Sequence, residues 1–214
     1  MDIALYYAPN ACSLVPYVTL TEAKAAFEVR PLNFRKRQHF TPEYLKVNPR
    51  HKVPALVVDG RTLTENVAIQ VWIARAFPDA RLLPADPWQE VKAISVLSWC
   101  ASGMHPPLAR INNPAKFCDT PASEASIRAL AEKEVCESYA IADDMLAGRA
   151  FFFDHFTAAD AHFYWCFRRA TQLDVDVSAF RNGAAHFARM QERASVQKVI
   201  AYDASVLAEF AKVA

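Results

Sequence analysis

A proline-rich stretch at residues 78–87 divides the chain into two parts with different sequence patterns. Three of its ten residues are prolines, which interrupt helices and strands and are typical of linkers. Before this stretch, short apolar segments alternate between the periods of strands and helices. After it, no segment has a convincing strand pattern and helical periodicity dominates. The sequence therefore predicts an α/β part followed by an all-helical part.

The first part is predicted to form a βαβ unit followed by an αββα unit. Asp59-Gly60 lies between two short apolar segments and is a strong hairpin turn signal. Thr41 and Pro42 have the residue types that cap and open a helix. We expect strands at residues 2–7, 27–32, 55–58 and 61–64, and helices at residues 14–26, from residue 41 onward and at residues 64–77.

The second part is predicted to be helical throughout. A helix over residues 88–112 contains His105-Pro106-Pro107, which should kink or interrupt it. A second helix is expected between Thr120-Pro121 and Gly148. Thr157 and Asp160 are spaced as a capping box that opens a third. Residues 184–212 are expected to form two or three shorter helices.

Charge and cysteine content limit the classes of function. The formal net charge is +1, which argues against a role on nucleic acid or membrane surfaces based on bulk charge. The five cysteines include no CxxC pair and no zinc-type spacing, so we expect free thiols, a reducing compartment and no metal site. No signal peptide or membrane span is apparent, which predicts a cytoplasmic protein.

Cys12 occupies the most informative position in the first part. It lies where the strand at residues 2–7 gives way to the helix that starts near residue 14. The unpaired N–H groups and partial positive charge of a helix N-terminus favour a thiolate over a thiol. The alternative is a small buried apolar residue, which is the common fate of a cysteine. The position favours a functional thiol, and the pattern alone does not take the argument further.

Two polar features allow both a structural and a ligand-binding interpretation. The basic stretch at residues 35–39 is either a solvated loop or a rim that attracts an anionic ligand. Glu65 and Asn66 stand at the start of a helix and either cap it or bind a ligand. In the second case the helix N-terminus would receive a carboxylate and Glu65 an ammonium group. Pro54 precedes a strand, and a cis bond there could free the Val53 backbone to pair with a ligand.

Four motifs in the same order resemble those of glutathione transferases, and of the bacterial beta class in particular. Residues 6–16 resemble Tyr-Tyr-x-Pro-x-Ala-Cys-Ser-x-x-Pro, and residues 48–56 resemble Asn-Pro-x-x-x-Val-Pro-Ala-Leu. Residues 63–69 resemble Leu-Thr-Glu/Gln-Ser/Gly/Asn-x-Ala-Ile. Residues 157–160 resemble the capping box of the superfamily. The matches extend over most of the chain.

This resemblance implies a thioredoxin-like domain at residues 1–79, a linker at 80–87 and an all-α domain at 88–214. It implies that glutathione is the co-substrate, with cis-Pro54 beside the Val53 backbone that pairs with its cysteinyl part. Glutathione would also be held by Lys52, Glu65, Asn66 and Ser102. Cys12 and His105 would act in catalysis with Ser13 as a further donor, and Tyr7, Ala11 and Arg169 would line the substrate pocket. For Tyr7, a core strand aromatic is the favoured alternative.

The sequence departs from the family pattern at four positions. Pro106 replaces a basic residue, Arg169 a tryptophan, Phe153 a glycine and Asn10 another glycine. These changes affect the expected choice of electrophile more than glutathione binding. A charged side chain at 169 in particular makes the expected pocket more polar.

The leading functional hypothesis is therefore a glutathione-dependent transferase of beta-class type. It would conjugate glutathione to apolar electrophiles, with thiol–disulfide exchange through Cys12 as a further activity, and would form a two-fold dimer. One alternative is a reductase or isomerase that uses glutathione. The other is a transferase-fold protein without catalysis that works as a binding or regulatory partner.

Overall fold

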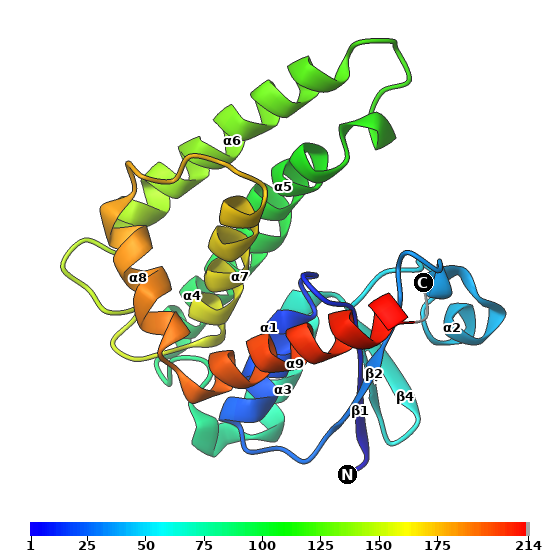
Figure 1. Ribbon diagram of the computed structural model, residues 1–214. Coiled ribbons are helices and arrows are strands. Elements are labelled where there is room, and N and C mark those ends of the chain that lie inside the picture. The colour runs from blue at the N-terminus through cyan, green and yellow to red at the C-terminus, as the bar shows by residue number, and fades with distance from the viewer. Residues whose placement is uncertain (213–214) are drawn as a thin grey trace. The chain divides into compact units, whose positions relative to one another are not determined.

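The computed structural model describes residues 1–212 and contains two compact units (Figure 1). One unit consists of Met1–Leu83 together with the chain from Glu192 onward, and the other is Pro84–Gln191. The last helix, α9 (Ala194–Lys212), therefore belongs with the first unit. The predicted domain limits of 1–79, 80–87 and 88–214 count this helix with the second part and stay a prediction.

The first unit is built on a mixed sheet of four strands, which confirms the thioredoxin-like class of the prediction. The strands are β1 (Ile3–Tyr7), β2 (Glu28–Pro31), β3 (Ala55–Val58) and β4 (Arg61–Thr64), in the order β2-β1-β3-β4. β1 pairs with β2 in parallel and with β3 antiparallel, and β3 and β4 form the predicted hairpin.

The sequence explains the order of the strands. The central strand β1 is buried at four of its five residues, as expected for a strand covered on both faces. β2 lies at the edge and ends at Pro31, which has no N–H to donate to a neighbouring strand.

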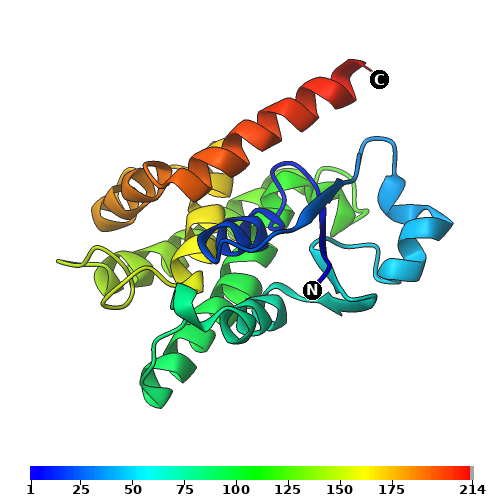
Figure 2. The same cartoon turned by 90° about the horizontal axis from the view of Figure 1, so that it is seen from below.

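Helices α1 (Leu14–Glu22), α2 (Pro42–Val47) and α3 (Asn66–Ala76) complete the first 83 residues, with 3₁₀ turns at Gln38–Phe40 and Pro78–Ala80. α1 is shorter than predicted because Lys24 adopts a left-handed conformation, φ 53°, and ends the helix. Thr41 caps α2 as predicted, accepting a hydrogen bond from the Tyr44 N–H. In Figures 1 and 2, α2 lies out beyond the sheet, away from α1 and α3.

The C-terminal helix α9 packs against α1, which lies near the N-terminus of the chain (Figure 1). The hydroxyl of Tyr7 on β1 donates to Asp203 Oδ1 over 2.5 Å, and both side chains are buried. Arg193 pairs with Glu22 at 2.7 Å just before α9 begins. These contacts explain why the last helix belongs to the first unit.

The second unit is entirely helical over its described residues. Its helices are α4 (Pro87–Trp99), α5 (His105–Asn112), α6 (Glu124–Met145), α7 (Ala158–Gln172) and α8 (Arg181–Gln191), with a 3₁₀ turn at Pro114–Lys116. Cys100–Met104 forms a π-helical turn between α4 and α5. Pro106 and Pro107 have no N–H to donate to the preceding turn, which is the physical reason for the predicted interruption.

The start of α6 differs from the prediction. We expected the helix to open at Thr120-Pro121, but it begins at Glu124. Ala122 has a left-handed backbone, φ 63°, so the preceding residues form a turn instead of a first helical turn.

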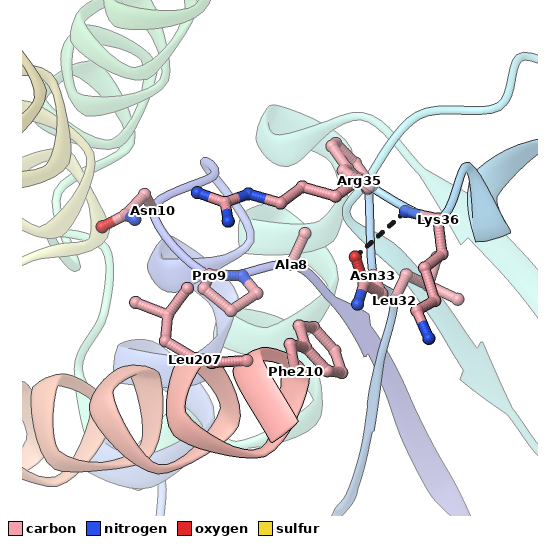
Figure 3. Close-up of a pocket in the computed structure, with 11 residues that line it drawn as sticks. Ala8, Pro9, Asn10, Leu32, Asn33, Arg35, Lys36, Leu207 and Phe210 are labelled. Carbon is pink, nitrogen blue, oxygen red and sulfur yellow. Dashed lines mark hydrogen bonds between the residues drawn. The ribbon is translucent and has the colours of Figure 1, made fainter. Parts of the chain in front are cut away.

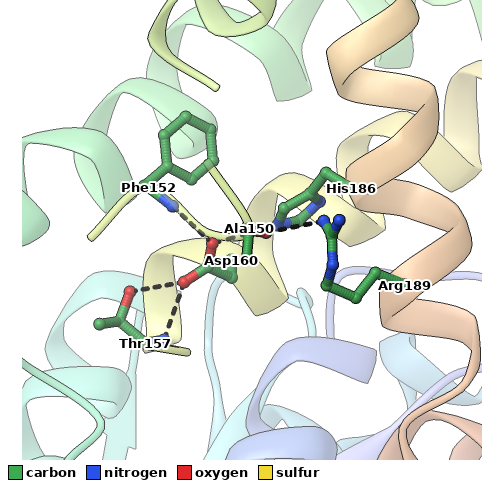
Figure 4. Close-up of polar contacts among 6 residues, drawn as sticks. All are labelled: Ala150, Phe152, Thr157, Asp160, His186 and Arg189. Carbon is green, nitrogen blue, oxygen red and sulfur yellow. Dashed lines mark hydrogen bonds and ion pairs between the residues drawn. The ribbon is translucent and has the colours of Figure 1, made fainter. Parts of the chain in front are cut away.

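α7 begins with the predicted capping box (Figure 4). The buried Asp160 carboxylate accepts from the Thr157 N–H at 2.8 Å and from the Phe152 N–H at 3.0 Å. His186 on α8 lies 3.1 Å from the same carboxylate. The box therefore joins the start of α7 to the segment before it and to α8.

Candidate active site

The loop between β1 and α1 carries Cys12 and is held in place by Ser13. The Ser13 hydroxyl donates to the Ala8 carbonyl at 3.2 Å and accepts from the Ala8 N–H at 3.1 Å. A further bond from Ala11 N–H to Ala8 O, 3.2 Å long, closes the turn. Ser13 is completely buried. These contacts give Ser13 a structural role in the loop, and its predicted catalytic role finds no support in them.

Cys12 sits in the turn before α1, as predicted, with only 7% of its surface exposed. Its thiol donates to the carbonyl oxygen of Val53 over 3.5 Å. Its own carbonyl accepts a hydrogen bond of 3.0 Å from Nδ2 of Asn66. The turn is thus joined both to the segment before β3 and to the start of α3.

Burial raises the pKa of the Cys12 thiol to about 12. Hydrogen bonding at the turn and the positive charge of Lys52 lower this pKa, and the negative charge of Glu65 raises it, but burial is the largest effect. Hydrogen bonding at the turn lowers this pKa, as the position before a helix predicts, but loss of solvation raises it further. The net shift therefore favours the neutral thiol, opposite to the direction expected from the helix N-terminus alone.

The segment before β3 presents Val53 and Pro54 to the thiol. The Val53–Pro54 peptide bond is cis. The Lys52 carbonyl accepts from the Tyr44 hydroxyl and, at 2.8 Å, from the Asn48 side-chain amide. Asn48 also accepts from the Arg50 N–H at 3.1 Å. Asn48 and Tyr44 therefore fix this segment, while the Lys52 side chain is exposed.

Glu65 and Asn66 begin α3 in an unusual conformation. Glu65 has φ 69° and ψ 123°, which side-chain-bearing residues rarely adopt and which is typical of functional sites. Its carboxylate is exposed and pairs with Arg50 at 2.5 Å. Oδ1 of Asn66 is buried and finds no hydrogen-bond partner among residues 1–212. An acid, a cation and an unused amide oxygen therefore meet where α3 begins.

The comparisons with known proteins bear on this constellation. The sequence matches the family described as "Glutathione S-transferase, N-terminal domain" over residues 1–75. It is 33% identical to Glutathione S-transferase GstA of Escherichia coli O157:H7 over 204 residues, covering 92% of this chain and 96% of that protein. The chain belongs to the glutathione S-transferase family.

A solved structure and a more distant relative add to this. A sphingomonad glutathione S-transferase complexed with glutathione is 30% identical, with a TM-score of 0.83, over 94% of this chain and 98% of that one. A probable maleylacetoacetate isomerase 1 of Drosophila melanogaster is 35% identical over 103 residues, which are 47% of this chain and 42% of that protein. The family therefore includes relatives named for transfer and relatives named for isomerisation.

Three residues that the family resemblance placed in the site lie in the second unit. His105 opens α5, and its ring packs edge-to-face on Trp165 with centroids 4.5 Å apart. The Ser102 hydroxyl donates to the Ser98 carbonyl at 2.8 Å. Arg169 is bonded to Asn112 and Gln172, and burial lowers its pKa. Their roles toward glutathione and electrophile stay predictions.

Tyr7 and Ala11, which were both predicted to line the substrate pocket, differ in how deeply they are buried. Tyr7 is fully buried and its hydroxyl donates to Asp203, which agrees with the alternative of a core strand aromatic. Ala11 is half-buried on the turn beside Cys12. Sequence reasoning missed Arg50, whose only signal was its place two residues before Lys52 in a motif that the family shares.

The described part of the chain contains neither a cluster of metal-ligand side chains nor a helix that could span a membrane. No three histidine, cysteine, aspartate or glutamate side chains there gather as metal ligands. No helix within residues 1–212 combines the length and apolarity needed to cross a bilayer.

Proposed function

We propose that this chain binds glutathione in its first unit and conjugates it to apolar electrophiles, as a transferase of the beta-class type. The observation that carries the proposal is that hydrogen bonds connect Cys12 to both Val53 and Asn66. The thiol lies 3.5 Å from the Val53 oxygen, and the Asn66 amide lies 3.0 Å from the Cys12 oxygen. Family membership and the bound glutathione of the sphingomonad relative support it.

The γ-glutamyl end of glutathione carries an ammonium and a carboxylate. Glu65 would receive the ammonium, and the unused Oδ1 of Asn66 offers a second acceptor. Arg50 and the N-terminus of α3 would receive the carboxylate. The Val53 backbone beside cis-Pro54 would pair with the cysteinyl part, and Lys52 would attract the glycyl carboxylate.

Cys12 would act as a neutral hydrogen-bond donor to the sulfur of bound glutathione. A thiol with a pKa of about 12 keeps its proton at pH 7 and can donate it to a neighbouring thiolate. In the reaction, the glutathione thiol gives up its proton, its sulfur forms a bond to the electrophilic carbon, and the leaving group departs with the bonding electrons. Exchange of disulfides through Cys12 needs its thiolate, which burial opposes.

The second unit would supply the remaining groups. His105 would take or return the proton, Ser102 would contact glutathione and Arg169 would make the electrophile site more polar. We further propose a cytoplasmic homodimer that acts in detoxification. Large apolar side chains on α4 and α6 support association, since Trp88, Val91 and Ile141 are 67%, 57% and 56% exposed.

A second candidate is a glutathione-dependent isomerase. It is favoured by one observation, the 35% identity to a probable maleylacetoacetate isomerase over about half of the chain. Isomerisation would use the same glutathione site but would end with glutathione released unchanged. Assays that measure glutathione consumption therefore separate the two candidates.

Two substitutions at position 12 test the proposed role of the thiol. Cys12→Ala should lower kcat/KM for conjugation of a nitro-substituted aryl chloride by about tenfold, the effect of one charge-assisted hydrogen bond. Cys12→Ser keeps a donor and should stay within about threefold of the parent protein. Equal and complete loss in both variants would show that sulfur chemistry at Cys12 is required and would overturn the donor role.

A further inference from the structure

The segment at residues 35–52 is strongly basic, although the whole chain is close to neutral. It contains six arginines and lysines and one acidic residue, Glu43, so its formal charge is +5 in a chain whose net charge is +1. The six cationic side chains are all exposed, and they lie on the loop after β2, on α2 and on the turn before β3 (Figure 1). They are Arg35, Lys36, Arg37, Lys46, Arg50 and Lys52. The prediction against nucleic acid used the total charge, which does not describe this segment.

Four aromatic rings follow one another along the same segment. The His39 ring contacts both Phe34 and Phe40, with centroids 4.2 Å and 4.3 Å away. His51, on the turn before β3, stacks on Phe40 with centroids 4.5 Å apart and an interplanar angle of 29°. We call Phe34, His39, Phe40 and His51 the ring row. Stacking of its side chains joins the loop after β2 to the turn before β3.

The ring row is open to solvent and lies beside a guanidinium. Phe34 and Phe40 are 41% and 39% exposed, although phenylalanine is usually buried. The Arg37 guanidinium lies 4.8 Å from the centroid of the Phe40 ring, within the range of a cation–π interaction. Exposed rings next to cations are the combination that binds single-stranded nucleic acid, because bases stack on the rings and phosphates pair with the cations.

The backbone holds this surface in a conformation that side-chain-bearing residues rarely adopt. Arg37 has φ 55° and His51 has φ 47°, both in the left-handed region. The Asn33 side chain accepts from the Lys36 N–H at 3.1 Å, and the His51 N–H donates to the Asn48 carbonyl at 2.9 Å. Strained backbone of this kind is typical of functional sites. Because both loops are already fixed, little conformational entropy is lost when a ligand binds.

The distribution of the charges and the kind of apolar residue indicate which polyanion fits. Six cations on two loops and a helix suit a row of phosphates better than a single anionic group. A membrane surface would be bound by exposed aliphatic side chains that enter the bilayer, but the two aliphatic residues of the segment, Leu45 and Val47, are half-buried. Arg50 already pairs with Glu65 at 2.5 Å, so Arg37 is the cation that best serves a ligand on the rings.

We propose that the ring row and the exposed cations around it bind single-stranded nucleic acid. Bases would stack on Phe34 and Phe40, and Arg37 would pair with a backbone phosphate. Binding would depend little on base sequence, since every base has a face that can stack. The basic stretch at residues 35–39, which the sequence left open between a solvated loop and an anion-attracting rim, is then a rim. The proposal does not depend on glutathione chemistry.

Fluorescence anisotropy with two labelled oligonucleotides tests this surface. One is a thymidine strand of twelve nucleotides, and the other is an abasic strand of the same length, which has the phosphates without the bases. The parent chain should bind the thymidine strand saturably at low salt, about tenfold more tightly than the abasic strand, as expected from the stacking of one base. A uridine strand of the same length distinguishes RNA from DNA as the source of the ligand.

Substitutions separate stacking from charge. Phe40→Ala should weaken the thymidine strand about tenfold and leave the abasic strand unchanged, whereas Phe40→Trp keeps a ring and should bind like the parent chain. Arg37→Gln should weaken both strands and reduce the steepness of log affinity against log salt by about 0.7, the value for one phosphate contact on a single strand. Phe117→Ala, at a side chain 52% exposed in the second unit, and Arg61→Gln, at an exposed residue of β4, are the matched controls and should change neither strand.

Three results would overturn the proposal. The first is no saturable binding of the thymidine strand at low salt. The second is equal binding of the two strands with no effect of Phe40→Ala, which would show attraction to charge alone. The third is tighter binding to phosphatidylserine vesicles than to the thymidine strand, which would make this a membrane surface. Glutathione titration of Phe40→Ala should match that of the parent chain, so failure of this proposal and failure of the proposed function are seen separately.

Discussion

The N-termini of α1 and α7 differ in how completely their polar groups are used. At α7, Thr157 and Asp160 bond each other's backbone, and the Asp160 carboxylate also bonds Phe152 and lies 3.1 Å from His186. At α1, Ser13 makes no side-chain cap, because its hydroxyl is bonded to Ala8. The capping bonds at α7 use its N-terminal polar groups within the protein, whereas the start of α1 has no side-chain cap and is where we propose that the ligand binds.

The unused bonds beside α1 extend this contrast. Asn66 keeps a buried oxygen without a partner in the described chain, and the bond from the Cys12 thiol to the Val53 oxygen is long, at 3.5 Å. Buried groups of this kind cost stability, which proteins tolerate where ligands bind.

Asp160→Ala should have the largest effect on stability. It leaves the buried Phe152 and Thr157 N–H groups and the His186 ring without their acceptor, and should cost about 3 kcal/mol of the free energy of unfolding. Urea unfolding measures this, with the exposed Asp119→Ala as a control expected to change it by less than about 0.5 kcal/mol. A cost near that of the control would mean that the completed box is not what stabilises the start of α7.

His162, two residues after Asp160, tests the cost of a buried group without a partner. Neither ring nitrogen bonds to a described residue, and burial lowers its pKa to about 3. The unfolded chain takes up a proton below about pH 6.5 and the folded chain does not, so stability is lost as pH falls from 6.5 toward 3. Between pH 7 and 5 this amounts to about 2 kcal/mol.

Replacement of this histidine by an apolar side chain isolates the effect. In the parent chain, this histidine should lower the free energy of unfolding by about 2 kcal/mol between pH 7 and pH 5. His162→Phe should remove that contribution, so its stability should depend less on pH. Urea titrations of both proteins at the two pH values measure the difference. An unchanged pH dependence would show that another group is responsible.

Ser13→Ala should have a moderate effect on stability. The substitution removes two bonds to the Ala8 backbone and should cost about 1.5 kcal/mol, with the exposed Ser205→Ala as the control. Because the hydroxyl is already used, conjugation activity per folded molecule should stay within about twofold. A large loss of activity without loss of stability would return Ser13 to the catalytic role predicted from sequence.

The thiols of Cys12 and Cys118 should differ in reactivity with little change in stability at pH 7. The pKa of Cys12 is raised to about 12 by burial, whereas hydrogen bonding, chiefly with Thr120, lowers that of the half-buried Cys118 to about 7. Alkylation by iodoacetamide should rise about tenfold per pH unit at Cys12 from pH 7 to 9 and level off near pH 8 at Cys118. Peptide mass spectrometry resolves the two sites, and a plateau below pH 8 at Cys12 would contradict its neutral resting state.

Much of the fold could be predicted because it rests on local signals. The hairpin of β3 and β4 has a turn dipeptide, the start of α7 has a capping box, and β2 has an edge proline. The end of α1 and the start of α6 could not be predicted. They depend on left-handed backbone at Lys24 and Ala122, residue types that give no signal for it.

The site could be predicted only in part, for a similar reason. Shared motifs identified Cys12, Pro54, Glu65 and Asn66, but the state of the thiol depends on burial by distant segments. The partner of Tyr7 is Asp203, 196 residues later, and no pattern within β1 indicates it. A cavity of about 670 Å³ between the turn after β1, the loop after β2 and α9 likewise forms only in the folded chain (Figure 3).

Titration of reduced glutathione into the protein by calorimetry tests the central claim most directly. We expect saturable binding to the parent chain, weakened about tenfold by Glu65→Ala and by Asn66→Ala, since each removes a bond to a charged group. Absence of binding at millimolar glutathione would contradict it. The transferase fold would then serve a binding or regulatory partner role, and the open polar groups around Cys12 would need another ligand.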